Sequence, residues 1–133
     1  MKKLFLAVAL LVFTFGFSKA ENNKDYSNNY FGKLAISVNP FCKLIQMGDY
    51  DAVKALIEEG QDVNQKSTGL TPLMFAARHN QADIAKLLIE HGAKLKTKSD
   101  RGGYTALDYA KMSNANEAYS VIEEALKMKK AKK

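Results

Sequence analysis

The sequence from Thr71 to Ala93, TPLMFAARHNQADIAKLLIEHGA, gives the clearest indication of the fold. Thr71 is a typical N-cap residue, and Pro72 suits the first helical position, where its missing N–H is not needed. Asn80 tolerates the left-handed conformation that ends a helix and turns the chain back. A second helix, ending at Gly92, is predicted by an apolar stripe with spacings of three and four: Ile84, Leu87 and Leu88. The stretch therefore predicts two short helices joined by a tight turn.

The same pattern occurs three times along the chain. Three candidate helix starts are spaced by 32 and 34 residues: Asn39-Pro40, Thr71-Pro72 and Thr105-Ala106. Three candidate helix stops have the same spacings: Gly48, Asn80 and Asn114. The flanking units also carry a second apolar stripe: Val53, Leu56 and Ile57, then Val121, Ile122 and Ala125. Independent features in register, with a period near 33 residues, indicate an internal repeat.

This repeat resembles the ankyrin repeat, whose signature is T-P-L-H-x-A. The resemblance covers about 39–126 and is most specific at Thr71–Ala77 and Ile84–Ala93. It implies an all-α solenoid of three helix-turn-helix units with short hairpin-like turns, at about 39–70, 71–103 and 104–126. The signature histidine is replaced, so its hydrogen bonds are expected to be absent or altered: Cys42, Met74 and Asp108 stand in its place.

The N-terminus predicts a signal peptide of bacterial type over residues 1–20. Lys2 and Lys3 precede the apolar run Leu4–Phe17, and Ser18-Lys19-Ala20 forms a small-x-small cleavage site. The run is short for a membrane span, although an uncleaved anchor is the alternative. We therefore expect cleavage after Ala20 and a periplasmic or secreted protein.

Removing residues 1–20 from the 133 leaves 113, enough for one domain. Residues 21–38 are predicted to form a polar segment followed by a capping arm. The overall charge of +6 is concentrated at the ends, because the body from Glu21 to Leu126 has 12 basic against 14 acidic residues. No nucleic-acid partner is therefore expected. The lysine-rich tail at 127–133 is predicted to be a solvated cap, and the alternative is a membrane-surface or polyanion-binding site.

The sequence contains few residues that could support catalysis or bind a metal. Cys42 is the only cysteine, so no internal disulfide is possible, and we expect it to be a small core residue. His91 occupies a turn position that is structural in the ankyrin family, and His79 has no third ligand in view. The sequence contains no H-E-x-x-H, C-x-x-C or glycine-rich phosphate loop. The chain is therefore predicted to be non-enzymatic, with no cofactor and no metal, and an enzyme is a remote alternative.

The resemblance also implies a partner-binding strip along the concave face. Its first variable window contains six residues: Gln46, Met47, Arg78, His79, Met112 and Ser113. A second column and the hairpin tips add Leu70, Tyr104, Ser67, Thr68, Arg101 and Gly102. Offsets of 32 and 33 are expected to align Met47, His79 and Met112 in one column. The alternative is that apolar members such as Leu70 pack under neighbouring helices.

Methionine, aromatic and arginine side chains with few acids are typical of an interface. We therefore expect a monomeric protein–protein interaction module that binds an unidentified protein partner through the concave ankyrin face. Toxin immunity, the holding of a secretion client and the scaffolding of an envelope enzyme are all compatible with such a module.

Overall fold

The computed structural model describes residues 38–133. Six helices run in order through this part of the chain: α2 (Pro40–Met47), α3 (Tyr50–Glu58), α4 (Pro72–Arg78), α5 (Ala82–Glu90), α6 (Ala106–Met112) and α7 (Asn116–Ala131). They form three helix pairs, and residues 38–133 contain no strand. The predicted all-α repeat architecture is confirmed. The signal peptide and nearly all of the capping arm lie outside the described residues.

The first helix of each pair begins where the sequence predicts. The Asn39 side chain accepts a hydrogen bond from the Cys42 amide at 2.8 Å. Thr71 accepts one from Met74 at 3.3 Å, and Thr105 makes the corresponding bond in the third repeat. Each helix is followed by a residue with positive φ: Gly48 at 74°, Asn80 at 52° and Asn114 at 52°. The caps and stops thus reproduce the predicted repeat units.

The residues that replace the signature histidine keep a contact with the cap. The Thr71 amide donates to the Met74 sulfur at 3.4 Å. In the third repeat the Thr105 amide and hydroxyl donate to Asp108 Oδ2 at 2.9 Å and 3.0 Å. These hydrogen bonds from Thr105 lower the pKa of the Asp108 carboxyl below its ordinary value of 3.8. The histidine bonds are therefore altered, as expected, and each helix still has its first turn capped.

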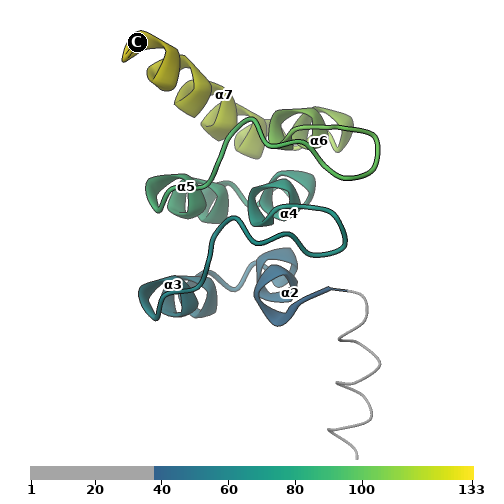
Figure 1. Ribbon diagram of the computed structural model, residues 1–133, viewed down its shortest axis with the longest axis vertical. Coiled ribbons are helices and arrows are strands. Elements are labelled where there is room, and N and C mark those ends of the chain that lie inside the picture. The colour runs from purple at the N-terminus through teal and green to yellow at the C-terminus, as the bar shows by residue number, and fades with distance from the viewer. Residues whose placement is uncertain (1–37) are drawn as a thin grey trace, which may run out of the picture. The chain divides into compact units, whose positions relative to one another are not determined.

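The helix pairs stack so that α2, α4 and α6 form one layer and α3, α5 and α7 form the other (Figure 1). The central repeat is the most deeply buried, because it has a neighbour on each side. In α4 every residue from Pro72 to Ala77 is buried, and Leu88 in α5 is fully buried. The stripes of the end repeats are less covered, and Leu56 and Val121 are only half-buried. The hydrophobic core therefore forms by stacking of neighbouring repeats and not within any single repeat.

The two links between repeats differ in length, as the unequal spacing predicts. In the first link, Thr68 and Gly69 have φ of 52° and 83°. They lie between Ser67 and Leu70, whose backbones exchange hydrogen bonds at 2.9 Å and 3.0 Å. This is a two-residue hairpin turn. The second link is a longer loop, closed by the Ser99 amide donating to the Tyr104 carbonyl at 2.8 Å. The extra residues of the second link lie at its tip, so both links lead directly into the next helix.

Polar side chains tie successive repeats together. Asn64 donates from Nδ2 to the Gly92 carbonyl at 3.1 Å and accepts from the Lys94 amide at 2.8 Å. One repeat later, Asn80 accepts from the Ala118 amide at 3.1 Å and donates to Glu117 Oε2 at 2.6 Å. Each of these asparagines bridges to the next unit. They fix the position of neighbouring repeats as well as their own turns.

The last helix is longer than the others. α7 has 16 residues and continues to Ala131, so most of the segment predicted as a lysine-rich tail at 127–133 is helical. Lysines in the last turn interact favourably with the partial negative charge at a helix C-terminus. None of the helices in the described part of the chain is long and apolar enough to cross a bilayer.

Candidate protein-binding face

The residues predicted to bind a partner come from the C-terminal ends of α2, α4 and α6 and from the two hairpin tips. Three of their apolar side chains are exposed: Met47 by 68%, Met112 by 54% and Tyr104 by 45%. The polar and glycine members are also exposed at Arg78, His79, Thr68, Arg101, Gly102 and Ser113. Because α4 packs against both α2 and α6, the three helix ends lie side by side. We call Met47, Arg78, His79, Tyr104 and Met112 the inner patch.

The predicted column of Met47, His79 and Met112 is wrong by one residue in the third repeat. Met47 and His79 each directly precede a residue with positive φ, Gly48 and Asn80, and the residue in this position before Asn114 is Ser113. Met112 lies two positions before Asn114 and is therefore equivalent to Arg78, which lies two positions before Asn80. The offset of 34 between the stops at Asn80 and Asn114 already implied this alignment. Met112 therefore lies diagonally from His79, one helical position away from the expected column.

Leu70 and Ser67 are less available than the other predicted residues. Leu70 is half-buried and packs against the core, which supports the alternative that it serves the fold. Ser67 is buried, and its hydroxyl accepts a hydrogen bond from the Asn39 amide at 2.8 Å. Gln46 is also half-buried. The surface open to a partner is therefore narrower than the predicted strip.

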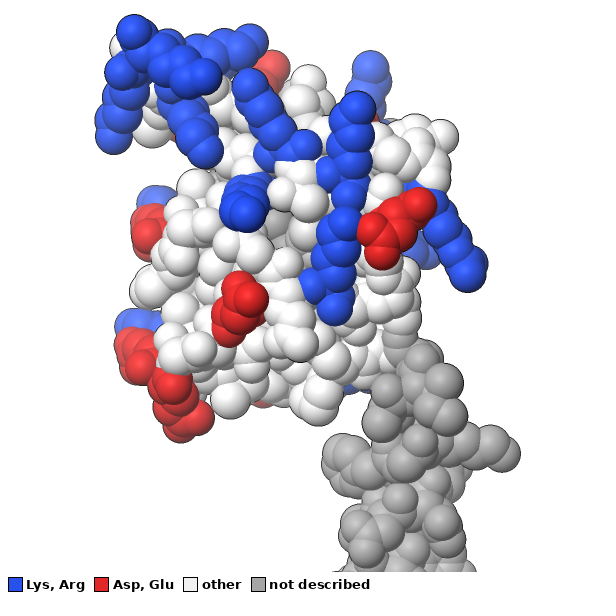
Figure 2. Space-filling view, in the orientation of Figure 1, with Lys and Arg blue, Asp and Glu red and all other residues white. Residues whose placement is uncertain are grey.

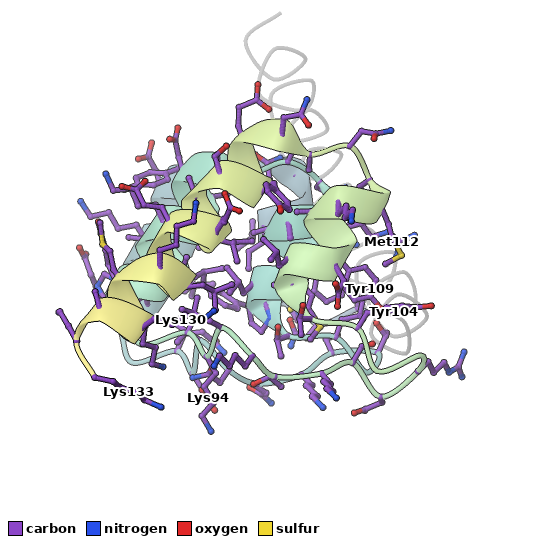
Figure 3. All side chains as sticks on the ribbon, turned by 90° about the horizontal axis from the view of Figure 1, so that it is seen from above. Lys94, Tyr104, Tyr109, Met112, Lys130 and Lys133 are labelled. Carbon is purple, nitrogen blue, oxygen red and sulfur yellow. The ribbon has the colours of Figure 1, made fainter. Side chains whose placement is uncertain are left out.

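Tyr104 is held in place by a neighbour that was not among the predicted residues. Its ring meets the ring of Tyr109 edge to face, with centroids 6.0 Å apart and an interplanar angle of 78°. Figure 3 shows both tyrosines on the same side of the stack as Met112. Tyr109 is half-buried and belongs to α6. An exposed aromatic ring supported in this way loses little freedom when it binds.

The electrostatic character of the inner patch is positive. Desolvation, Arg78 and Lys43 all lower the pKa of His79 below its ordinary value of 6.5. Lys43 was also not predicted, although it precedes Met47 by four residues and so lies on the same face of α2. The lowered pKa favours the neutral form of His79, and Arg78 and Lys43 supply the positive charge. A partner with acidic groups around an apolar centre would complement this surface.

The groups considered for chemistry have structural roles. Cys42 is fully buried, and burial raises the pKa of its thiol to about 12, so the reactive thiolate is not formed near neutral pH. His91 Nδ1 lies 2.9 Å from the Leu87 carbonyl within its own turn. Across residues 38–133 no three histidine, cysteine or acidic side chains are grouped closely enough to hold a metal ion.

Comparison with known proteins agrees with this geometry. Residues 41–130 match the family described as ankyrin repeats in three copies. The chain is 34% identical over 101 residues to human M-phase phosphoprotein 8, covering 74% of this chain and 11% of that protein. It is 33% identical over 89 residues to the potassium channel GORK of Arabidopsis thaliana, covering 66% of this chain and 11% of the channel. The chain thus spans about a tenth of the length of these two relatives.

Among solved structures, the ankyrin repeat domain of human ASB11 superposes with a TM-score of 0.61 at 27% identity, covering 65% of this chain and 39% of that one. Ankyrin repeats generally mediate protein–protein contacts and typically carry no catalytic activity. The family match spans more than half of the chain and coincides with the three helix pairs. This chain belongs to the ankyrin-repeat family.

Proposed function

We propose that this chain is an exported, non-enzymatic binding module that holds a protein partner against the inner patch. One observation carries the placement of the site. Of the five large apolar side chains that are exposed within residues 38–133, three belong to the inner patch: Met47, Tyr104 and Met112. Apolar surface that a partner covers is removed from water, which favours association. The patch therefore combines most of these exposed apolar side chains with flanking positive charge.

The arrangement of the patch supports recognition of a protein rather than a small molecule. Its members come from three successive repeats and extend along the stack, so they present an extended surface. Methionine adapts to irregular partner surfaces, and tyrosine and arginine are frequent energetic centres of interfaces. We propose an acidic rim on the partner, opposite Arg78 and Lys43.

Export is supported by the order of features in the first twenty residues: a basic start, an apolar run and a small-x-small cleavage site. A fold with one buried cysteine and no disulfide relies on packing for its stability, which is compatible with either redox environment. We place the module in the periplasm or outside the cell, where its partner would also be found.

The proposal is tested with the purified chain as bait in an envelope extract from its native host. The test variant is Met47→Ala/Met112→Ala, and the matched control is Met128→Ala, which removes a methionine that is 58% exposed on α7. Truncating each interface methionine should weaken partner binding by about 1 to 3 kcal/mol, while Met128→Ala should leave it unchanged. Full retention of the partner by the double variant, with loss in Met128→Ala, would place the site on the layer formed by α3, α5 and α7.

A further inference from the structure

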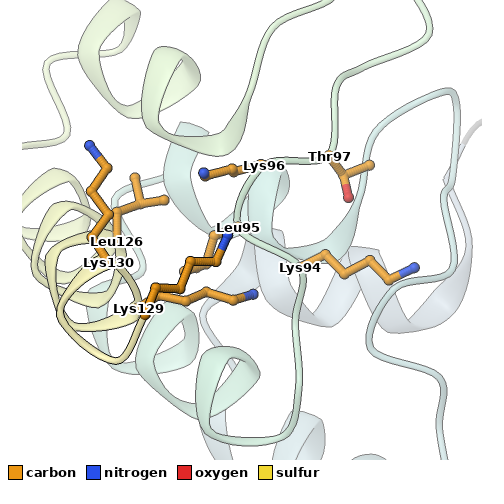
Figure 4. A pocket seen from close by; sticks show the side chains of 8 residues that line it. Lys94, Leu95, Lys96, Thr97, Leu126, Lys129 and Lys130 are labelled. Carbon is orange, nitrogen blue, oxygen red and sulfur yellow. The ribbon is translucent and has the colours of Figure 1, made fainter.

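A second surface feature lies between the last turns of α7 and the segment Lys94–Thr97 that follows α5 (Figure 4). It is a cavity of about 440 Å³. Leu95 and Leu126 provide apolar lining, and Leu95 is buried. Five lysines complete the wall: Lys94, Lys96, Lys129, Lys130 and Lys133. We call these the cavity lysines.

The cavity lysines are built into place by two separate elements. On α7, Leu126, Lys129 and Lys130 have spacings of three and four, so they share one face of the helix, and Lys133 follows the C-cap residue Lys132. On the opposite wall, the Lys94 amide donates to Asn64 Oδ1 at 2.8 Å, which ties that segment to the first repeat. Lys127 and Lys132 belong to the same tail but do not line the cavity. The cluster is thus a product of the fold and not merely of a basic tail.

The charge of the cavity is uncompensated. Within residues 38–133 two ion pairs are found, Lys66 with Asp100 and Lys127 with Glu123, and neither involves a cavity lysine. No acidic side chain lines the cavity. Figure 2 shows a cluster of basic side chains at the C-terminal end of α7, and further basic side chains across the same face. The carbonyls at the helix end offset only about half an elementary charge, so a strongly positive hollow remains.

We propose that this cavity is a binding site for a small anion that carries several phosphate groups. Lysine ammonium groups bind phosphate oxygens as compact point charges, and the five lysines of the lining match an anion that carries several negative charges. The cavity volume falls in the range of small-ligand sites, and the two leucines suit the carbon frame that joins the phosphates. Both a lipid headgroup and a soluble phosphate ester have this chemistry.

The phosphate site is separate from the inner patch. Figure 3 shows Lys94, Lys130 and Lys133 on one side of the stack and Tyr104, Tyr109 and Met112 on the other. Neither site contributes a residue to the other. The two activities are therefore expected to be separable by mutation, and the phosphate site does not depend on the identity of the protein partner.

The test is calorimetric titration of the folded chain with inorganic tripolyphosphate. The test variant Lys96→Ala/Lys130→Ala removes one ammonium group from each wall. The control variant Lys127→Ala/Lys132→Ala removes the same charge from the tail outside the cavity. We expect the test variant to bind about 25-fold more weakly, at roughly fivefold per lysine, and the control to change by less than about threefold. Unchanged melting temperatures would show that both variants are folded.

Two vesicle arms distinguish the sources of the phosphate. Phosphatidylcholine vesicles carrying phosphatidylinositol bisphosphate are compared with phosphatidylserine vesicles of equal surface charge. Binding to the former that tripolyphosphate displaces supports a lipid headgroup as the ligand, and binding to tripolyphosphate alone supports a soluble phosphate ester. Absence of saturable tripolyphosphate binding, or equal weakening in the two double variants, would overturn the site and reduce the lysines to a diffuse positive surface.

Discussion

Asn80 offers the sharpest test of how one repeat supports the next. Asn80 and Asn114 occupy equivalent turns, are both exposed and share a φ of 52°. Only Asn80 reaches the following repeat, where its side chain accepts from the Ala118 amide at 3.1 Å. Among the described residues no hydrogen bond is made by the side chain of Asn114. The variants Asn80→Gly and Asn114→Gly therefore share the same backbone conformation and differ in the two hydrogen bonds that Asn80 makes, to the Ala118 amide and to the Glu117 carboxylate.

The expected difference follows from the start of α7. Its N-cap residue, Ala115, has no side chain that can cap the helix, so Asn80 supplies the cap from the previous repeat. Losing such a cap costs about 1 kcal/mol. Glycine accepts positive φ without strain, and its added freedom in the unfolded chain is the same at both positions. Asn80→Gly should therefore be about 1 kcal/mol less stable than Asn114→Gly, and Asn80→Ala should lose about 1 to 2 kcal/mol more through strain.

Urea denaturation followed by circular dichroism measures this difference directly. In thermal melts, 1 kcal/mol corresponds to about 4 to 8 °C for a domain of about 60 to 100 residues. The bond from Asn80 also lowers the pKa of Glu117 below its ordinary value of 4.5. A carboxyl with a lowered folded pKa stabilises above its unfolded value and loses that contribution as the pH falls. The gap between the two glycine variants should thus narrow below pH 4.5. Equal unfolding free energies at pH 7 would refute the role of Asn80 as an inter-repeat cap.

Three further predictions address the core, the inner patch and export. Leu88→Ala should lower the free energy of unfolding by about 2 to 5 kcal/mol, because Leu88 is fully buried in the central repeat. Lys130→Ala should change it by less than about 0.5 kcal/mol. Equal urea midpoints for the two variants would contradict the stacking described above. Because folding lowers the pKa of His79, protonation of this side chain destabilises the folded protein, and stability should decline as the pH falls below 6.5. In the Lys43→Ala variant, NMR titration should show a higher pKa for His79. A pKa unmoved by that variant would mean that Lys43 does not act on His79. Mass spectrometry of the protein from its native host should find a chain beginning at Glu21, and a dominant species that retains Met1 would remove the support for export.

The helix boundaries and the repeat were predictable from the sequence because they depend on local chemistry. N-caps such as Asn39 and Thr71, and stops such as Gly48 and Asn80, act through backbone groups only a few residues away. The exposed ends of the first helices were predictable from the ankyrin resemblance. The alignment of Met112 with Arg78 was not predicted correctly, although it follows from the spacing between the helix stops Asn80 and Asn114.

Contacts between repeats were decided only by the tertiary structure. Asn80 meets Glu117 across 37 positions, and Asn64 meets Lys94 across 30. Asn114 has the same backbone conformation as Asn80 but lies in the last of the three described repeats, where no following repeat supplies a partner. The tail lysines are likewise visible in the sequence, but their convergence with Lys94 and Lys96 depends on how α7 packs against α5. Local backbone chemistry defines each repeat, whereas the surfaces that we propose as binding sites form where residues far apart in the sequence are brought together by burial of a shared core.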